Sequence, residues 1–234
     1  APTGSLKSHI PRTKSDLAHR FTARAVPNQS VDDHHQISSR AEEGKIGLDD
    51  PLKNWYPKFK RSNKKNLTLR RLLTHTAQIK AWIPFWRNTL KKNGTFKKNT
   101  FQRDSTALFN VKITDSLWLH EAYRDKIFKA IKKSKLNKAP GYVYSDMSFY
   151  LYPEVVESLT GQPFETYLKN TFYRQMGAYS LTFNPLRYYP KDWIIPTEND
   201  TFFRKTQIHG VVHDEGAIML GGVSGHAGLF GNIT

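Results

Sequence analysis

The sequence predicts an α+β fold, and two observations support this class. Helical patterns fill the first two thirds of the chain, whereas the strand candidates, residues 181–183 and 228–233, lie in its last third. The regular alternation of strands and helices that is typical of a doubly wound parallel sheet is absent. No internal repeat is found, and no apolar run approaches the roughly 20 residues that a membrane-spanning helix needs.

The first helical segments are short. Residues 38–45 are expected to end a helix that stops at Gly44, and residues 52–56 are expected to form a helical turn between two prolines. Thr68 is placed to cap a helix whose apolar residues recur at i, i+3 and i+4, namely Leu69, Leu72 and Leu73.

Three further helices follow from apolar spacing. Residues 125–136 are amphipathic, with lysines on the polar face. Residues 148–159 are also helical in pattern, with Pro153 near the start of the helix and Gly161 after its end. Pro163 suits the first position of the next helix.

Residues 81–110 are expected to be a long loop or an insertion. Three aromatic residues, Trp82, Phe85 and Trp86, lie close together at its start. They could form a wall of a substrate site, but a plug of the hydrophobic core is the favoured interpretation.

Composition limits the possible functions. At 234 residues the chain can bury a sizeable core and would form one domain or two small ones. The absence of cysteine excludes disulfides, a thiol nucleophile and thiolate metal sites. It is compatible with an oxidising compartment. No secretory apolar segment is visible in residues 1–12.

The formal net charge is +16. Most of it lies in residues 58–71, 87–103 and 124–138, and such a field attracts nucleic acid, anionic lipid or acidic cell-wall polymer. A solvated lysine-rich surface is the simpler interpretation. Because no nucleic-acid recognition motif accompanies these runs, a nucleic-acid partner is not expected.

Two motifs carry the functional interpretation. Residues 209–230 hold six of the 14 glycines and three of the nine histidines, and glycine allows tight turns and close approach. The run from Gly221 to Gly228 indicates a strand entered from a tight loop, with His226 at the bend. About 80 residues upstream, Tyr144-Ser145-Asp146 follows a Pro-Gly pair.

Together these motifs resemble the serine beta-lactamase and penicillin-binding-protein superfamily, in its class C and esterase-like branch. Members combine a Ser-x-x-Lys nucleophile with a Tyr-x-Asn-type element and a Lys-Thr-Gly-type strand, and Tyr-Ser-Asp and His-x-Gly are familiar variants of the last two. Flanking segments occur in the family's order: EGKIGLDDPL at 43–52, LLTHT at 72–76, LTG at 159–161 and MG at 176–177.

The resemblance covers about residues 41–234 and implies an antiparallel sheet flanked by helices with a mostly helical second lobe. Residues 1–40 do not resemble the family, and the domain is expected to be incomplete at both ends. Residues 182–215 resemble a narrower branch, whose members can be fused behind a family-3 glycoside hydrolase domain of bacterial envelopes. A fused or associated glycoside hydrolase is therefore a possible partner.

The resemblance also implies roles for individual residues. Tyr144 would take the proton of the serine, Asp146 would orient neighbouring groups and the substrate amide, and His226 would lie near the substrate carboxylate or Tyr144. The substrate would be bound by Ser145, Ala227 and Gly228, with one oxyanion donor from the backbone of the last two. The histidine of LLTHT, His75, is expected to pack and to form hydrogen bonds rather than to catalyse.

The family's nucleophile is not found where it is expected. Residues 1–40 contain no Ser-x-x-Lys. The single match, Ser62 to Lys65, lies in a solvated basic run without the apolar helix that would bury a lysine, so it is rejected. Ser30, and after it Ser15, are the alternative candidates for the nucleophile.

No metal or other cofactor is expected. His209 and His213 are spaced i, i+4, but the HExxH order of a zinc hydrolase is absent. The run at 32–35, Asp-Asp-His-His, is interpreted as a solvated loop.

The sequence thus predicts a beta-lactamase-like serine hydrolase of the periplasm or the extracellular envelope. It would act on amide or ester bonds of peptidoglycan-type or small-molecule substrates through an acyl-serine, and its catalysis would be impaired. The alternative is a non-catalytic relative that binds cell wall or associates with a glycosidase. A serine with a lysine one turn later, upstream of residue 42, would favour the enzyme.

Overall fold

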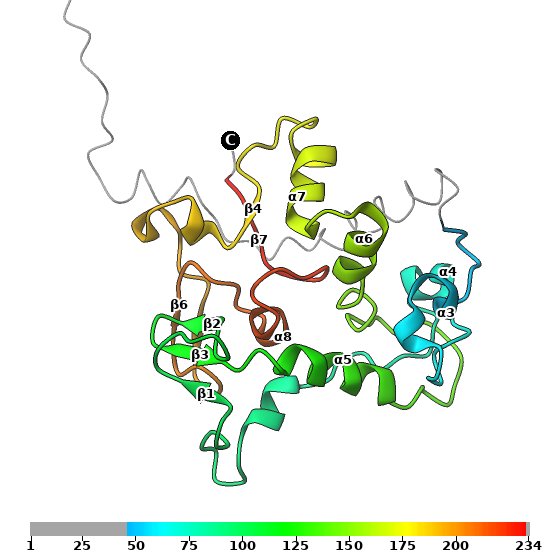
Figure 1. Cartoon of the computed structure of the whole chain (residues 1–234), viewed down its shortest axis with the longest axis horizontal. Helices are drawn as coiled ribbons and strands as arrows, with labels where there is room; N and C mark the ends of the chain where they lie inside the picture. Colours follow the sequence, from blue (N-terminus) through cyan, green and yellow to red (C-terminus); the bar gives the residue numbers. More distant parts are fainter. Residues whose placement is uncertain (1–45, 233–234) are drawn as a thin grey trace, which may run out of the picture.

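The computed structural model describes residues 46–232, in which short helices lie beside small antiparallel sheets (Figure 1). This arrangement confirms the predicted α+β class. Four features discussed above lie outside the described residues. They are the leader at 1–40, the helix end at Gly44, the Asp-Asp-His-His run at 32–35, and the serines Ser15 and Ser30. Within the described part, no helix has the length and apolar character needed to cross a bilayer.

The short N-terminal helices form where they were expected. Helix α3 spans Leu52–Trp55, the 3₁₀ turn η1 spans Pro57–Phe59 and helix α4 spans Leu69–Leu73. The Thr68 hydroxyl accepts the backbone N–H of Arg71 at 3.3 Å, which confirms the predicted cap. The apolar residues of α4 are buried in the larger of two hydrophobic clusters.

The longer helices also follow their local signals. Helix α5 spans Tyr123–Lys133, and α6 spans Tyr152–Thr160 and is followed by Gly161 at φ 69°. Helix α7 spans Phe164–Leu168, so Pro163 occupies the position before the helix rather than its first residue. The π-helical turn η3 (Lys169–Tyr173) continues α7, and helix α8 spans Glu215–Met219.

The expected long loop at 81–110 is only partly irregular. It contains the 3₁₀ helix η2 (Phe85–Thr89) and strand β1 (Phe101–Gln102). Strand β1 joins β2 (Val111–Thr114) and β3 (Leu117–Leu119) in an antiparallel sheet of order β1-β3-β2. Phe85 is buried and the Trp86 ring packs against Phe202 and Phe203, as expected of a core plug, but Trp82 is 50% exposed and does not belong to the plug.

Two further antiparallel pairs complete the described strands. Strand β4 (Thr182–Phe183) pairs with β7 (Leu229–Phe230), which confirms both strand candidates. Strand β5 (Glu198–Asp200) pairs with β6 (Thr206–Ile208), and the 3₁₀ turns η4 (Pro185–Arg187) and η5 (Lys191–Trp193) connect β4 to β5.

The two hydrophobic clusters meet near the predicted site. The larger includes α3, α4, α5, residues 147–155 and α8, whereas the smaller joins α7 to the β4–β7 pair. In Figure 1, α8 lies near the centre of the view, and the glycine-rich segment runs from it to β7. The glycine-rich segment therefore passes from one cluster to the other.

Candidate functional site

The segment that carries Tyr144 is held in place by His75. The backbone N–H of Ser145 donates to Nδ1 of His75 at 3.2 Å, and the N–H of Val143 donates to the His75 carbonyl oxygen at 2.9 Å. The rings of His75 and Tyr144 lie 4.6 Å apart. Because Nδ1 of His75 accepts a hydrogen bond, its ring proton is on Nε2. His75 thus has the packing and hydrogen-bonding contacts that were expected of it.

Ser145 points into the protein. Its side chain is buried, and its hydroxyl donates to the Lys80 carbonyl oxygen at 2.7 Å and accepts the N–H of Met147 at 3.1 Å. The hydroxyl is therefore engaged by the backbone at the turn. The substrate-binding role suggested for Ser145 stays a prediction.

Tyr144 presents its ring to solvent, with 50% of the residue exposed. Partial burial raises the pKa of Tyr144 to about 12, and the charge of Asp146, the hydrogen bond to Asp146 and the neighbouring Tyr142 act in the same direction. Within residues 46–232, no lysine or arginine is among the groups that shift this pKa. At neutral pH Tyr144 is therefore a neutral phenol that can donate or accept a hydrogen bond.

His226 lies inside the protein between two polar partners. Its Nδ1 is 2.9 Å from the Ser224 hydroxyl, and its Nε2 is 3.1 Å from Oδ1 of Asp214. The side chain is only 4% exposed, and its ring stacks on that of Tyr150 with centroids 4.1 Å apart. These contacts leave the imidazole in one orientation.

Asp214 connects His226 to the start of α8. Besides His226, its Oδ1 accepts the N–H of Ala217 at 2.6 Å and so caps the helix. Burial by itself would raise the pKa of Asp214. The hydrogen bond from His226, its charge and the Ala217 N–H outweigh burial and hold this pKa below its usual value.

Tyr150 links the two predicted motifs. Its N–H donates to the Asp146 carbonyl oxygen at 3.3 Å, while its ring covers His226. Burial, followed by the charges of Asp214, Asp146 and Glu215, raises the pKa of Tyr150 well above its ordinary value. A Cβ at Gly216 in α8 would lie 1.7 Å from the Tyr150 hydroxyl, so a glycine is needed there. Convergence of Tyr144 and His226 on one cleft stays a prediction.

The glycine run before β7 is required by close packing. Gly228 has φ 113°, and a Cβ there would lie 2.3 Å from the Gly222 carbonyl oxygen. Gly222 has φ 82°, and a Cβ there would lie 2.2 Å from Oδ1 of Asn184. Ala227 is buried between them and β7. This geometry explains the glycines at 222 and 228 independently of any oxyanion role, which remains a prediction for Ala227 and Gly228.

Arg204 positions the segment that precedes Asp214. Its guanidinium bonds the carbonyl oxygens of Val212, at 2.9 Å, and His213, and its Nε lies 2.8 Å from Oδ2 of Asp200. Both side chains of this ion pair are fully buried. The buried Arg204–Asp200 ion pair therefore holds the backbone next to Asp214 in place, and with it the contact between Asp214 and His226.

The two remaining sequence signals have ordinary structural roles. Nε2 of His209 lies 2.6 Å from the Ile194 carbonyl oxygen, and the described residues contain no group of three side chains suited to a metal. Ser62 and Lys65 belong to a turn, in which the Ser62 hydroxyl accepts the N–H of Lys64 at 3.1 Å and Lys65 is exposed.

Sequence reasoning missed three of these contributors. The motifs pointed to Tyr144, Asp146 and His226, but not to Tyr150, Arg204 or the pairing of His226 with Asp214. The capping role of Asp214 had a sequence signal, because aspartate before a short helix is a favoured N-cap. Tyr150 contacts His226 across the fold and had no local signal. Arg204 bonds residues only four to nine positions away, and its pairing with Asp200 was not recognised.

Comparison with known proteins agrees with this architecture. The Beta-lactamase family model matches residues 37–234. An Escherichia coli (strain K12) protein, provisionally named a D-alanyl-D-alanine carboxypeptidase, is 38% identical over 128 residues, which cover 49% of this chain and 30% of that protein. The chain thus matches under a third of this relative's length.

Two solved structures share the fold. A beta-lactamase/D-alanine carboxypeptidase from Yersinia pestis has a TM-score of 0.54 at 17% identity, covering 92% of this chain and 51% of the other. A D-stereospecific amidohydrolase from Streptomyces sp. has a TM-score of 0.55 at 19% identity, covering 91% and 56%. Because the family model matches most of this chain, the chain belongs to the Beta-lactamase family.

Proposed function

We propose that this chain is a beta-lactamase-like serine hydrolase domain with impaired acyl transfer. Its ligands would be amides or esters of the peptidoglycan type, bound without formation of an acyl-serine. The names of its relatives, a D-alanyl-D-alanine carboxypeptidase and a D-stereospecific amidohydrolase, support this ligand class. The same relatives favour action in the periplasm or outside the cell.

The observation that carries the proposal is the placement of Tyr144. Its ring is half exposed, its backbone neighbours are fixed by His75, and the nearby Asp146 helps to raise its pKa. A neutral hydroxyl in this position can bond a carbonyl or amide of a ligand. It is a poor general base, because its pKa is about 12 rather than near neutrality.

The same chemistry supports impaired catalysis. A nearby cation lowers the pKa of a tyrosine, and the lysine of a Ser-x-x-Lys motif would be such a cation. Residues 1–40 contain no such motif, and the match at Ser62 lies in an exposed turn outside the Tyr144 segment. The lack of Ser-x-x-Lys in residues 1–40, and the lack of a cation that shifts the Tyr144 pKa within residues 46–232, both support this part of the proposal.

The non-catalytic alternative is favoured by a different observation. Ser224 and His226 are bonded to each other and buried, and the Tyr150 ring covers the imidazole. A histidine held in this way serves the scaffold rather than a ligand. In that case the domain would bind cell-wall material, or a glycosidase partner, through another surface.

Replacing Tyr144 with phenylalanine separates these two proposals. We expect binding of N-acetyl-D-alanyl-D-alanine or benzylpenicillin to weaken about three- to tenfold, the effect of losing one hydrogen bond. Isothermal titration calorimetry measures the dissociation constants. Tyr179, which is 72% exposed on a separate loop, provides the matched control as Tyr179→Phe. Equal affinities for the wild type and Tyr144→Phe would favour the alternative, in which the domain binds through another surface.

A further inference from the structure

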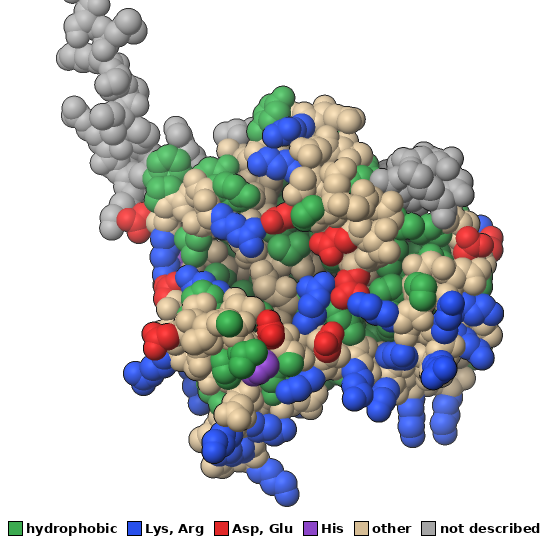
Figure 2. Space-filling view, in the orientation of Figure 1, with side chains coloured by type: hydrophobic (Ala, Val, Ile, Leu, Met, Phe, Trp, Pro, Cys, Tyr) green, Lys and Arg blue, Asp and Glu red, His purple; other side chains and the backbone are tan. Residues whose placement is uncertain are grey.

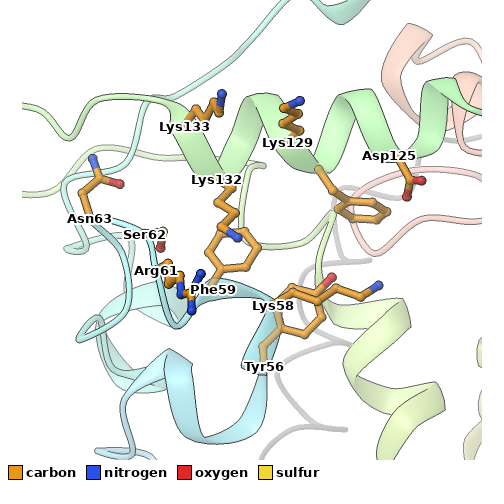
Figure 3. A pocket seen from close by; sticks show the side chains of 11 residues that line it. Tyr56, Lys58, Phe59, Arg61, Ser62, Asn63, Asp125, Lys129, Lys132 and Lys133 are labelled. Atoms are coloured by element: carbon orange, nitrogen blue, oxygen red, sulfur yellow. The ribbon is translucent and has the colours of Figure 1, made fainter.

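A groove with a volume of about 900 Å³ lies between α5 and residues 56–63, which include η1 (Figure 3). None of the residues that line it belongs to the Tyr144–His226 region. Figure 2 shows lysine and arginine side chains gathered over this part of the surface. The groove is therefore separate from the Tyr144–His226 region, and the positive charge of its lining distinguishes it from that region.

Most of the charge on the groove walls is unpaired within the described part of the chain. Three lysines of α5, Lys129, Lys132 and Lys133, line one wall at i, i+3 and i+4. They are spread over about 4.5–6 Å of the helix axis. Arg61 lines the opposite wall, and Figure 3 shows Lys132 reaching from α5 toward it.

Within residues 46–232, none of these four cations has a carboxylate partner. Lys58, also on the rim, does have one, because it lies 2.8 Å from Glu154. Asp125 is the only carboxylate among the lining residues. The groove thus presents several cations and almost no compensating anion.

A buried lysine beside the groove bonds the carbonyl oxygens at the end of α5. The C-terminal carbonyl oxygens of a helix attract nearby cations. At the end of α5 this role is taken by Lys64, whose Nζ donates to the carbonyl oxygens of Ser134 at 2.5 Å and Lys132 at 3.4 Å. Burial lowers the pKa of Lys64 to about 8. Lys64 thus satisfies these carbonyl oxygens without the rim cations Lys132 and Lys133.

The floor of the groove limits the kind of anion. Tyr56, Phe59 and Phe128 line it, but each is less than 10% exposed. Single-stranded nucleic acid is bound by stacking bases on accessible aromatic faces, which these rings do not offer. A helix that binds a membrane surface presents exposed apolar side chains, whereas the aromatic side chains of this groove are buried. Lysines bind as point charges without a demand for planar geometry.

We propose that this groove binds a flexible, phosphodiester-linked acidic polymer of the cell envelope and holds the domain near its ligand. The envelope location rests on the proposed function, whereas the recognition of a chain of phosphodiester groups rests on the groove alone. Negative groups spaced along the chain would pair with the α5 lysines and with Arg61 across the groove.

Binding of fluorescein-labelled poly(glycerol phosphate) to the 234-residue chain tests the proposal. The variant Arg61→Gln/Lys132→Gln removes one cation from each wall. We expect binding to weaken about tenfold near 100 mM salt, with a shallower salt dependence, because two fewer phosphates are neutralised. Fluorescence anisotropy between about 50 and 200 mM salt gives both quantities.

The matched control is Lys92→Gln/Arg103→Gln, which makes the same change in net charge at exposed residues outside the groove. Unchanged affinity in this control supports the groove, whereas equal losses in both variants would show that only the overall charge matters and would overturn the proposal. Duplex DNA, or vesicles of phosphatidylglycerol and phosphatidylcholine, bound more tightly than the polymer would overturn it as well.

The test is independent of the one for the Tyr144 site. Arg61→Gln/Lys132→Gln should leave the affinity for N-acetyl-D-alanyl-D-alanine unchanged, and Tyr144→Phe should leave polymer binding unchanged. If one proposal fails, its own test therefore shows this, and the test of the other proposal is unaffected.

Discussion

Replacing Arg204 with methionine is expected to lower the free energy of unfolding by about 3–5 kcal/mol, the usual cost of breaking a buried ion pair. Arg204 and Asp200 are both fully buried, and the guanidinium also bonds two backbone carbonyl oxygens. Methionine fills a similar volume but leaves these acceptors without the guanidinium. Urea denaturation followed by circular dichroism measures the change.

Arg187→Met is the control for this prediction. Arg187 pairs with Glu165 at 2.7 Å, but its side chain is 52% exposed, so the loss should stay within about 1 kcal/mol. Similar losses for the two variants would contradict the special role given to the Arg204 contacts.

Asp214→Ala is expected to cost about 2–4 kcal/mol, because it removes a helix cap and leaves the His226 Nε2 without its carboxylate partner. The folded-state pKa of Asp214 is lowered, so its stabilisation is fully present above the unfolded value of about 3.9. It is lost as the pH falls through the folded pKa. The difference between wild type and variant should therefore shrink in acid.

The adjacent carboxylate provides a control of opposite sign. Burial, the largest effect, and the charge of Asp214 raise the pKa of Glu215. The charged form of Glu215 is thus penalised in the folded state, and any favourable contribution is lost as the pH rises through its folded pKa. Glu215→Gln should be as stable as the wild type at pH 7, or more stable. A loss equal to that of Asp214→Ala would contradict this account of the site.

Elements with local signals could be predicted from the sequence. Thr68 caps α4, and Gly161 ends α6, because a cap and a left-handed residue act within one turn of the chain. The β2–β3 hairpin was missed, although the alternating residues around Asp115-Ser116 were a usable signal. Placing residues 81–110 in one loop also overlooked β1, whose partner is β3.

The site was predictable only as a set of positions. The motifs propose Tyr144, Asp146 and His226 as site residues, and this stays a prediction; the orientation of His226 depends on Asp214 and Tyr150. These contacts join segments 12 and 76 residues apart, and no periodicity or cap encodes them. The interior position of Ser145 is likewise set by the Lys80 carbonyl oxygen, 65 residues away.

The most direct test of the central claim is the intact mass of the chain after incubation with benzylpenicillin or a fluorophosphonate. The central claim is a family scaffold that binds its ligands but does not form an acyl-serine. It predicts an unmodified mass, because removing the nucleophile from such a catalytic unit lowers the rate by several orders of magnitude. A stoichiometric adduct on a mapped serine would contradict it and identify the nucleophile.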